Sequence, residues 1–399
     1  MLNIVFYFQV HQPYRLSHYK VLDIGTSESY FDDALNASIM RKVGDRCYLP
    51  TNYLLSRLIQ RHPDRFKVAF SITGTAVEQF KHYAPDVLDS FKRLVDTGNV
   101  ELIGETYYHS LSSLYDTDEF LEQMHLHRQM LRDEFGVVPT VFRNTELIYD
   151  DRLSDLVWEE EGFKVVLTEG ADRVLQWRSP LYAYKNYSKD LMLLLKHYKL
   201  SDDIAFRFSD SAWDEYPLTA EKFVHWINQL TLNEKRGHNQ FLNLFLDYET
   251  FGEHQWAESG IFEFMERLPE VVLRQPGLGF CFPSEATHYA NYQPEAISFP
   301  DPVSWADLER DTSAWLENDM QRNAIETLHE LLPRIKQAGR DDLLRLARLL
   351  STSDHFYYMS TKYFQDGDVH KYFSPYDSPE QAYIYFMNAM ADLEERMMG

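Results

Sequence analysis

The sequence predicts an α/β fold in which a parallel sheet closes into a (β/α) barrel and a helical region follows. Short apolar runs alternate with amphipathic segments through the first three quarters of the chain. Polar and acidic residues recur where the apolar runs end. After about Pro300 the alternation stops and the sequence favours helices alone. Strand–helix alternation of this kind is typical of parallel sheets.

The strands of the barrel are predicted from apolar runs bounded by turn-forming or polar residues. Between several of them lie amphipathic segments such as Ala84–Gly98, whose final glycine suits a helix end. The predicted strands are Asn3–Gln9, Phe66–Ile72, Val100–Ile103, Thr140–Arg143, Lys164–Leu167, Ile204–Phe208 and Asn243–Leu246.

The carboxyl ends of these runs carry the residues that could take part in catalysis or binding. They lead into His11-Gln12-Pro13, Thr73-Gly74-Thr75, Gly104-Glu105-Thr106, Asn144-Thr145-Glu146, Thr168-Glu169-Gly170 and Asp247-Tyr248-Glu249. In a closed barrel the carboxyl ends of all strands meet at one rim, where the catalytic groups of barrel enzymes lie. An open sheet would spread the same residues apart.

Two domains are predicted, a catalytic barrel over residues 1–300 and a helical bundle over residues 301–399 that packs on it and closes the cleft. In the second region Pro302 lies near a helix start and Gly339 suits a helix end. Ser378 and Gln381 have the spacing of a capping box before the last amphipathic segment.

The composition limits the partners of the chain. With 39 basic and 62 acidic side chains the net charge is −23, which disfavours nucleic acid and anionic membranes and favours a neutral or cationic ligand. Aromatic residues make up 15%; most belong in a core, but sugar rings also stack on such side chains. Two cysteines imply no disulfide framework. The first ten residues resemble a buried strand and not a signal peptide, so a cytoplasmic protein is expected.

Two carboxylates at strand ends are candidates for catalysis. Glu146 follows Arg143 and Asn144, and a nearby guanidinium lowers the pKa of a carboxyl, which suits a nucleophile. Asp247 ends the apolar run FLNLFL, and a low-dielectric setting raises the pKa, which suits a proton donor. Cleavage of a glycosidic bond requires such a pair, roughly 5–5.5 Å apart in a retaining enzyme. A cap or an ion pair is the alternative for either residue.

Five segments in order resemble the motif regions of glycoside hydrolase family 57, in particular its α-amylase-like members. They are HQPYRL, GNVELIGETYYHSL, FRNTEL, FLDYETFGEHQW and SWADLERDTSAWLENDMQ, and TSDHFYYMSTKYF extends the match. The resemblance implies an incomplete TIM-like (β/α)7 barrel, a helical bundle and retaining action on α-glucosidic bonds. On the matching positions, Glu146 would be the nucleophile and Asp247 the general acid/base. Glu146 lies in RNTE and not in the tryptophan-bearing context of several glucanotransferases, which leaves the acceptor open.

Five further residues are candidates for substrate binding. The resemblance makes His11 and His109 contacts of sugar hydroxyls, although either histidine could belong to the core. Glu249 lies two residues after Asp247 and could hold a hydroxyl, tune the acid or form an ion pair. Trp305 offers a stacking face, or packing at the domain junction. Asp354 could contact substrate or cap a helix. His125 and His127 diverge by about 200° on a helix, so they predict no metal site.

Three functions remain open from the residues. The first is an α-amylase on α-1,4-glucans, without cofactor or metal, with 4-α-glucanotransferase as its nearest alternative because both use one glycosyl-enzyme. The second is a metal-dependent carbohydrate hydrolase or deacetylase with His11, His109 and Asp247 as zinc ligands and Glu146 as base. The third is a non-catalytic glycan-binding protein. No residue predicts the oligomeric state.

Overall fold

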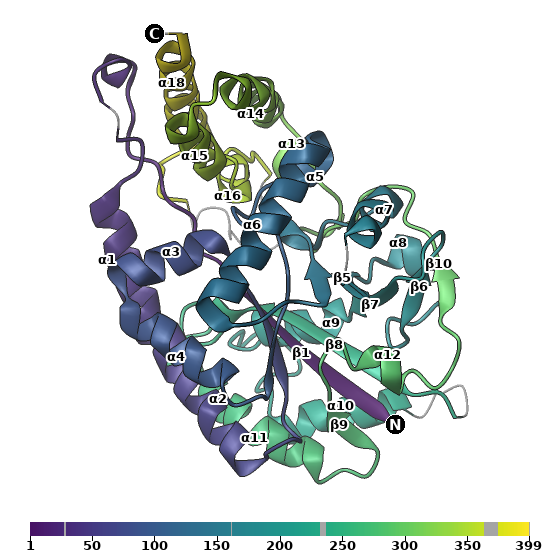
Figure 1. The fold of residues 1–399 in the computed structure, drawn as a ribbon. Helices are drawn as coiled ribbons and strands as arrows, with labels where there is room; N and C mark the ends of the chain where they lie inside the picture. The colour runs from purple at the N-terminus through teal and green to yellow at the C-terminus, as the bar shows by residue number, and fades with distance from the viewer. Residues whose placement is uncertain (28, 161, 232–236, 363–373, 399) are drawn as a thin grey trace.

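A ring of parallel strands forms the centre of the molecule, and a group of helices lies beyond one end of it (Figure 1). The computed structural model describes residues 1–27, 29–160, 162–231, 237–362 and 374–398. Within this part of the chain, seven parallel strands follow one another around the ring. They are β1 (Leu2–Val10), β2 (Val68–Ile72), β3 (Val100–Leu102), β4 (Val141–Arg143), β5 (Val165–Glu169), β7 (Met192–Lys196) and β8 (Gln240–Asp247).

Regular ladders join most neighbours in the ring, and two junctions are looser. The junction of β3 and β4 is an isolated parallel bridge between Gly104 and Phe142. Between β7 and β8, the backbone N–H of His197 donates to the carbonyl of Asn243 at 2.8 Å, and the Asn243 side chain donates to the carbonyl of Leu195 at 2.8 Å. The strands therefore follow one another around a closed ring, but regular ladders of hydrogen bonds are missing at these two junctions.

Three short strands add to the ring without belonging to it. The strand β9 (Leu278–Phe280) pairs in parallel with the first residues of β1. The strand β6 (Tyr184–Asn186) runs antiparallel to β7, and β10 (Glu295–Ile297) extends that edge.

The barrel is filled by one row of side chains from each strand. Every residue of β1 is buried, as a strand covered on both faces requires. The inward rows form one apolar cluster with members from six of the ring strands and Ile103 directly after β3, the others including Val5, Ala69, Val141, Val165, Leu194 and Phe245. Since side chains alternate along a strand, the residues two positions further along point the same way.

Helices cover the outside of the ring, and the three that begin at Gly74, Asp172 and Tyr198 start within three residues of a strand end. Thr73 caps α3 by accepting from the backbone N–H of Ala76 at 3.2 Å. The helices of this region are α1 (Asp33–Val43), α2 (Leu49–Arg61), α3 (Gly74–Tyr83), α4 (Pro85–Val95), α5 (Ser112–Tyr115), α6 (Thr117–Phe135), α7 (Asp151–Glu159), α8 (Asp172–Leu175), α9 (Tyr198–Ala205), α10 (Ala220–Thr231), α11 (Ile261–Leu273) and α12 (Ala286–Tyr289).

The C-terminal region is helical and has its own core. Its described helices are α13 (Ser313–Leu316), α14 (Asp319–Ala338), α15 (Asp341–Leu350), α16 (Ser353–Tyr357) and α18 (Pro379–Met398), and α14, α15 and α18 group at the top of Figure 1. Asn318 and Gln321 form a capping box at the start of α14, and Gly339 ends it in the left-handed conformation. The core of this region also takes in residues from the segment around Leu16 and Tyr30.

The structure confirms the predicted fold class, a (β/α)7 barrel followed by helices, and corrects one strand. The segment Ile204–Phe208 is the end of α9 and the turn after it, and the strand of this region is β7 at Met192–Lys196. The division at residue 300/301 stays a prediction.

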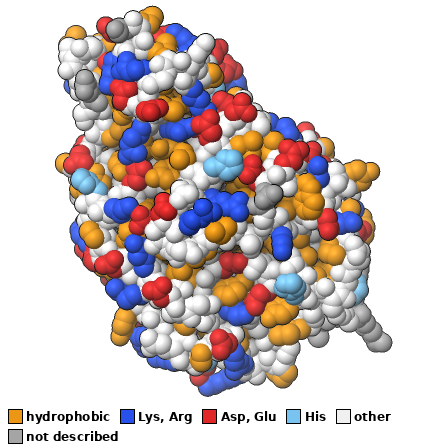
Figure 2. All heavy atoms as spheres, in the orientation of Figure 1, with side chains coloured by type: hydrophobic (Ala, Val, Ile, Leu, Met, Phe, Trp, Pro, Cys, Tyr) orange, Lys and Arg blue, Asp and Glu red, His pale blue; other side chains and the backbone are white. Residues whose placement is uncertain are grey.

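The surface on the side that Figure 2 shows carries charged side chains of both signs. Lysine and arginine side chains there are interspersed with acidic ones and form no continuous basic field. Among the described residues, no helix has both the length and the apolar character to cross a membrane.

Candidate active site

A layer of polar side chains closes the inside of the barrel at its carboxyl end. Each continues the inward row of its strand by one step, so that the apolar filling gives way to polar groups at the rim. We call these residues the polar layer: Gln9, Ser71, Glu105, Arg143, Glu169, Lys196 and Asp247. All are buried except Asp247, which is partly exposed. In a barrel of this type the rim at the strand carboxyl ends is where catalytic groups lie.

Glu146 lies directly above this layer on the turn that follows β4. Its backbone is left-handed, with φ 58°, which is uncommon for a side chain other than glycine and marks a constrained position. Three side chains reach its carboxylate. The indole Nε1 of Trp305 donates to Oε2 at 2.7 Å, the hydroxyl of Ser353 donates to Oε1 at 2.9 Å, and His109 Nε2 lies 3.3 Å from Oε1.

These contacts keep Glu146 ionised. Burial would raise the pKa of this carboxyl, but the hydrogen bond and the charge of His109, followed by the charge of Arg143 and the indole of Trp305, lower it below its ordinary value. The direction is the one expected from the neighbouring Arg143, although His109 is the larger cause.

His109 is held between two carboxylates. Its Nδ1 lies 3.1 Å from Glu105 Oε2, and its Nε2 faces Glu146. Burial lowers the pKa of His109, but the two carboxylates outweigh it and raise the pKa to about 9, so the ring is an imidazolium at neutral pH. The pKa of Glu105 falls to about 2 although burial opposes it, because His109 bonds to that carboxylate.

His11 stacks on His109 with ring centroids 4.0 Å apart. Its Nε2 lies 2.8 Å from Asp354 Oδ2 and its Nδ1 lies 3.0 Å from Thr73 Oγ1. Burial and the adjacent His109 lower the pKa of His11. His11 also contributes to a lowered pKa of Asp354. The two histidines therefore lie side by side with different charges.

Asp247 is the last residue of β8 and pairs in register with Gln9 of β1. Burial and the charge of Glu146 raise the pKa of Asp247 to about 6, against the opposing charges of Arg143, Lys196 and His109. Glu146 and Asp247 therefore influence each other by charge at the same rim. Asp247 therefore changes its protonation state near neutral pH while Glu146 stays charged.

The remaining predicted residues take different places. Trp305 covers Arg143, whose guanidinium carbon lies 4.7 Å from the indole centroid. Glu249 does not continue the strand beside Asp247 but lies on a 3₁₀ turn, buried, where it accepts from Tyr48 and, at 3.2 Å, from Gln12. Burial and the charge of Asp247 raise the pKa of Glu249 to about 8.

The sequence interpretation missed several groups that lie here. Glu105 and Glu169 follow predicted strands and were visible as rim residues, but nothing in their spacing distinguished them from caps. Lys196 lies at the end of the strand that was not predicted. Ser353 and Arg310 reach the rim from the C-terminal region, and no local pattern connects them to it.

The described residues give no support to a metal centre. Within the described ranges no three His, Cys, Asp or Glu side chains are arranged to hold a metal ion. The ring nitrogens of His11 and His109 all have close polar partners in Thr73, Asp354, Glu105 and Glu146. On α6, His125 is exposed and pairs with Glu160, whereas His127 is buried.

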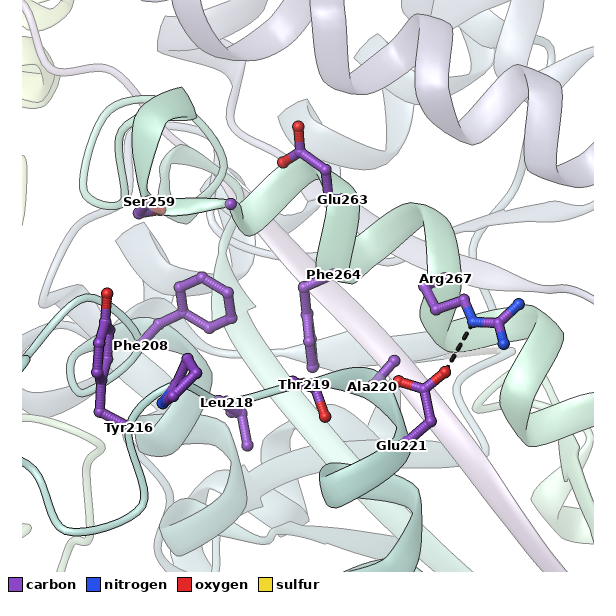
Figure 3. A pocket seen from close by; sticks show the side chains of 12 residues that line it. Phe208, Tyr216, Leu218, Thr219, Ala220, Glu221, Ser259, Glu263, Phe264 and Arg267 are labelled. Carbon is purple, nitrogen blue, oxygen red and sulfur yellow. Dashed lines mark hydrogen bonds and ion pairs between the residues drawn. The ribbon is translucent and has the colours of Figure 1, made fainter.

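A separate cavity of about 370 Å³ lies between α10 and α11 (Figure 3). Phe208 and Phe264 line it, and the Glu221–Arg267 ion pair lies at its edge. None of the predicted site residues lines this cavity. It therefore plays no part in the site at the barrel rim.

Solved structures that resemble this chain include a branching enzyme and a 4-α-glucanotransferase. A branching enzyme from Pyrococcus horikoshii superposes with a TM-score of 0.69 at 15% identity, covering 97% of this chain and 88% of that one. The 4-α-glucanotransferase from Thermococcus litoralis superposes with a TM-score of 0.65 at 15% identity, covering 89% of this chain and 56% of that one. At such identities the comparison establishes the fold.

Sequence comparison then gives the family. The model of "Glycosyl hydrolase family 57" matches residues 5–300. A protein of Methanocaldococcus jannaschii named "Putative alpha-amylase" is 43% identical over 403 residues, which cover 98% of this chain and 84% of that protein. The chain belongs to glycosyl hydrolase family 57 and is a glycoside hydrolase, which confirms the resemblance seen in its motifs.

Proposed function

We propose that this chain is a retaining α-amylase that cleaves α-1,4-glucans, with Glu146 as nucleophile and Asp247 as general acid/base. The observation that carries the proposal is that two carboxyls at the same barrel rim have pKa values shifted in opposite directions. Glu146 is held ionised, and Asp247 is raised to about 6. Separated pKa values in such a pair assign the acid and the nucleophile.

The reaction follows from these two states. Asp247 gives its proton to the glycosidic oxygen while the carboxylate of Glu146 attacks C1, so that the C1–O bond breaks and a sugar hydroxyl leaves. Water then gives its proton to Asp247 and attacks C1, which releases Glu146. The three donors on Glu146 limit its basicity, which suits a group that must also leave.

The neighbouring residues have supporting roles in this proposal. His11, His109 and Asp354 would contact sugar hydroxyls beside Glu146, and Trp305 would border the cleft. Glu249 would tune the pKa of Asp247 through the charge interaction between the two carboxyls. The contacts of Trp305 and Ser353 with Glu146 support a C-terminal helical region, over residues 301–399, that closes the cleft.

A cytoplasmic role in degrading starch or glycogen is also part of the proposal. Both cysteines, Cys47 and Cys281, are free and buried, as is usual in a reducing compartment. A 4-α-glucanotransferase would use the same two carboxylates, with a sugar hydroxyl in place of water in the second step.

The test is incubation of maltoheptaose with the wild type, Glu146→Gln and Asp247→Asn, followed by separation of the products by chain length. We expect shorter products from the wild type and rates at least about a hundredfold lower from both variants. The exposed Glu258→Gln is the matched control and should act as wild type. Products longer than maltoheptaose would favour transfer over hydrolysis. Wild-type rates in both variants would refute the assignment.

A further inference from the structure

Four charged side chains form a closed ring at the rim between the two carboxylates. Lys196 Nζ lies 3.8 Å from Glu169 Oε2 and 3.3 Å from Asp202 Oδ1. Arg310 completes the ring, with Nη1 3.4 Å from Glu169 Oε2 and Nη2 3.3 Å from Asp202 Oδ2. Basic and acidic side chains alternate around it, and all four are at most 15% exposed. A buried ion pair of this kind holds its members in place more than it stabilises the fold.

The ring places Lys196 beside the reacting groups. Its strand β7 lies next to β8, the strand that ends in Asp247. The His197 backbone N–H donates to the Asn243 carbonyl, and the Asn243 side chain donates to the Leu195 carbonyl. The ammonium is 5.2 Å from the ring centroid of Trp305, whose Nε1 donates to Glu146. Only 4% of Lys196 is exposed, so bulk water screens its charge little.

We propose that Lys196 is a positioning residue of the reaction. Held by Glu169 and Asp202, its ammonium compensates the negative charge that Asp247 acquires when it releases its proton. The inference rests on the proposed function, because it assigns Asp247 as the proton donor.

A cation beside Asp247 is needed because negative charge moves from Glu146 to Asp247 during the first step. In the first step the carboxylate of Glu146 becomes a neutral ester, and Asp247 becomes a carboxylate, so one negative charge moves toward β8. The positive charges of Arg143, Lys196 and His109 favour the ionised form of Asp247. The negative charges of Glu146 and the neighbouring Glu249 oppose it.

Lys196 differs from the other two cations that face Asp247. His109 bonds to Glu146, and the charge of Arg143 lowers the pKa of Glu146 as well as that of Asp247. His109 and Arg143 therefore also stabilise the ionised Glu146 that is present before the proton is transferred. Lys196 is anchored by residues of β5 and α9 and has no hydrogen bond to either catalytic carboxylate within the described residues.

The test compares Lys196→Met with the wild type on two substrates over a range of pH. One is maltoheptaose, and the other is a 4-nitrophenyl α-maltooligosaccharide, whose leaving group departs without a proton. We expect kcat on maltoheptaose to fall about tenfold or more, and kcat on the aryl substrate to change less than about threefold. KM should stay near its wild-type value on both substrates.

The pH profile gives the second readout. Since the lysine charge lowers the pKa of Asp247, its removal raises that pKa, and the basic limb of kcat/KM should move to higher pH by about one unit. Equal losses of kcat on both substrates, with an unmoved basic limb, would mean that Lys196 has a structural role alone and would overturn the proposal. Wild-type kcat and pH profile in Lys196→Met would overturn it as well.

Two further variants make the result specific. Lys196→Met combined with Glu169→Gln removes both charges of one ring contact, so no unpaired charge stays buried. It should show the same shift of the basic limb, and an unmoved limb in a folded double variant would overturn the proposal. Lys199→Met, on the exposed neighbour in α9, should leave the profile unchanged. Failure of the proposed function would be seen separately, as wild-type rates in Asp247→Asn.

Discussion

His109 determines the charge state of the candidate nucleophile more than any other residue at the site. It is fixed on one side by Glu105, at 3.1 Å, and presents its other nitrogen to Glu146 at 3.3 Å. With a pKa of about 9 it stays an imidazolium over the range in which a glycosidase works. The carboxylate of Glu105 thus acts on Glu146 through a histidine, and its hydrogen bonds with Gln9 and His109 offset part of the cost of its burial.

Replacement of His109 by glutamine should move the acid limb of kcat/KM to higher pH. Glu146 must be ionised to attack, so activity falls as pH drops through its pKa. The imidazolium lowers that pKa, and a neutral amide would let it rise, by about one unit or more. The exposed His125→Gln is the control and should leave the profile unchanged. An unmoved acid limb in His109→Gln would contradict the account of Glu146.

The covalent role of Glu146 can be tested by chemical rescue. Glu146→Ala leaves a space beside C1 and no nucleophile, so turnover should fall by about a thousandfold or more. Azide should restore part of the rate and yield a glycosyl azide of β configuration, because it attacks directly from the face that the carboxylate occupied. Recovery of an α-azide, or no recovery in a folded variant that still binds maltoheptaose, would speak against Glu146 as nucleophile.

At the scale of elements, most strands could be predicted from the sequence because each is an apolar run that ends in a polar rim residue. The strand β7 was missed, and Ile204–Phe208 was taken in its place, because isoleucine and phenylalanine in that stretch are typical of strands. Leucine in MLLLK has no β preference, and tertiary pairing with β5 and β8 decides the outcome. The error hid Lys196 and with it the charge ring.

The local sequence pattern predicted the part of the candidate site that lies at the ends of the ring strands, and it offered Trp305 and Asp354 as candidates from the C-terminal region. Glu146, Asp247, His11 and His109 follow strands, and one rim collects them wherever a barrel closes. Ser353 and Arg310, also from the C-terminal region, were not predicted, since they are 207 and 141 residues in sequence from their partners Glu146 and Glu169. Only the packing of α16 and of the segment before α13 brings them to the rim.

At the scale of the whole molecule, function and stability compete in the buried titratable groups. Buried carboxyls with lowered pKa, such as Glu105, stabilise the fold above their unfolded pKa, and this contribution is lost at low pH. Buried carboxyls with raised pKa behave oppositely. Burial raises the pKa of Glu101 and Glu169 to about 7 and that of Glu249 to about 8. Their stabilising effect is present below about pH 4.3 and is lost as pH rises through the folded pKa.

The free energy of unfolding should therefore decrease as pH rises from about 6.5 to 8.5, a window in which His109, with its raised pKa, acts in the same direction. Glu249→Gln isolates one contributor, because glutamine keeps an acceptor for Tyr48 and Gln12 but cannot ionise. We expect its midpoint of thermal unfolding to match the wild type near pH 4 and to exceed it by a growing margin as pH rises to 8.5. The exposed Glu258→Gln should follow the wild type throughout. Parallel curves for wild type and Glu249→Gln would mean that Glu249 has the same pKa in the folded and unfolded chain.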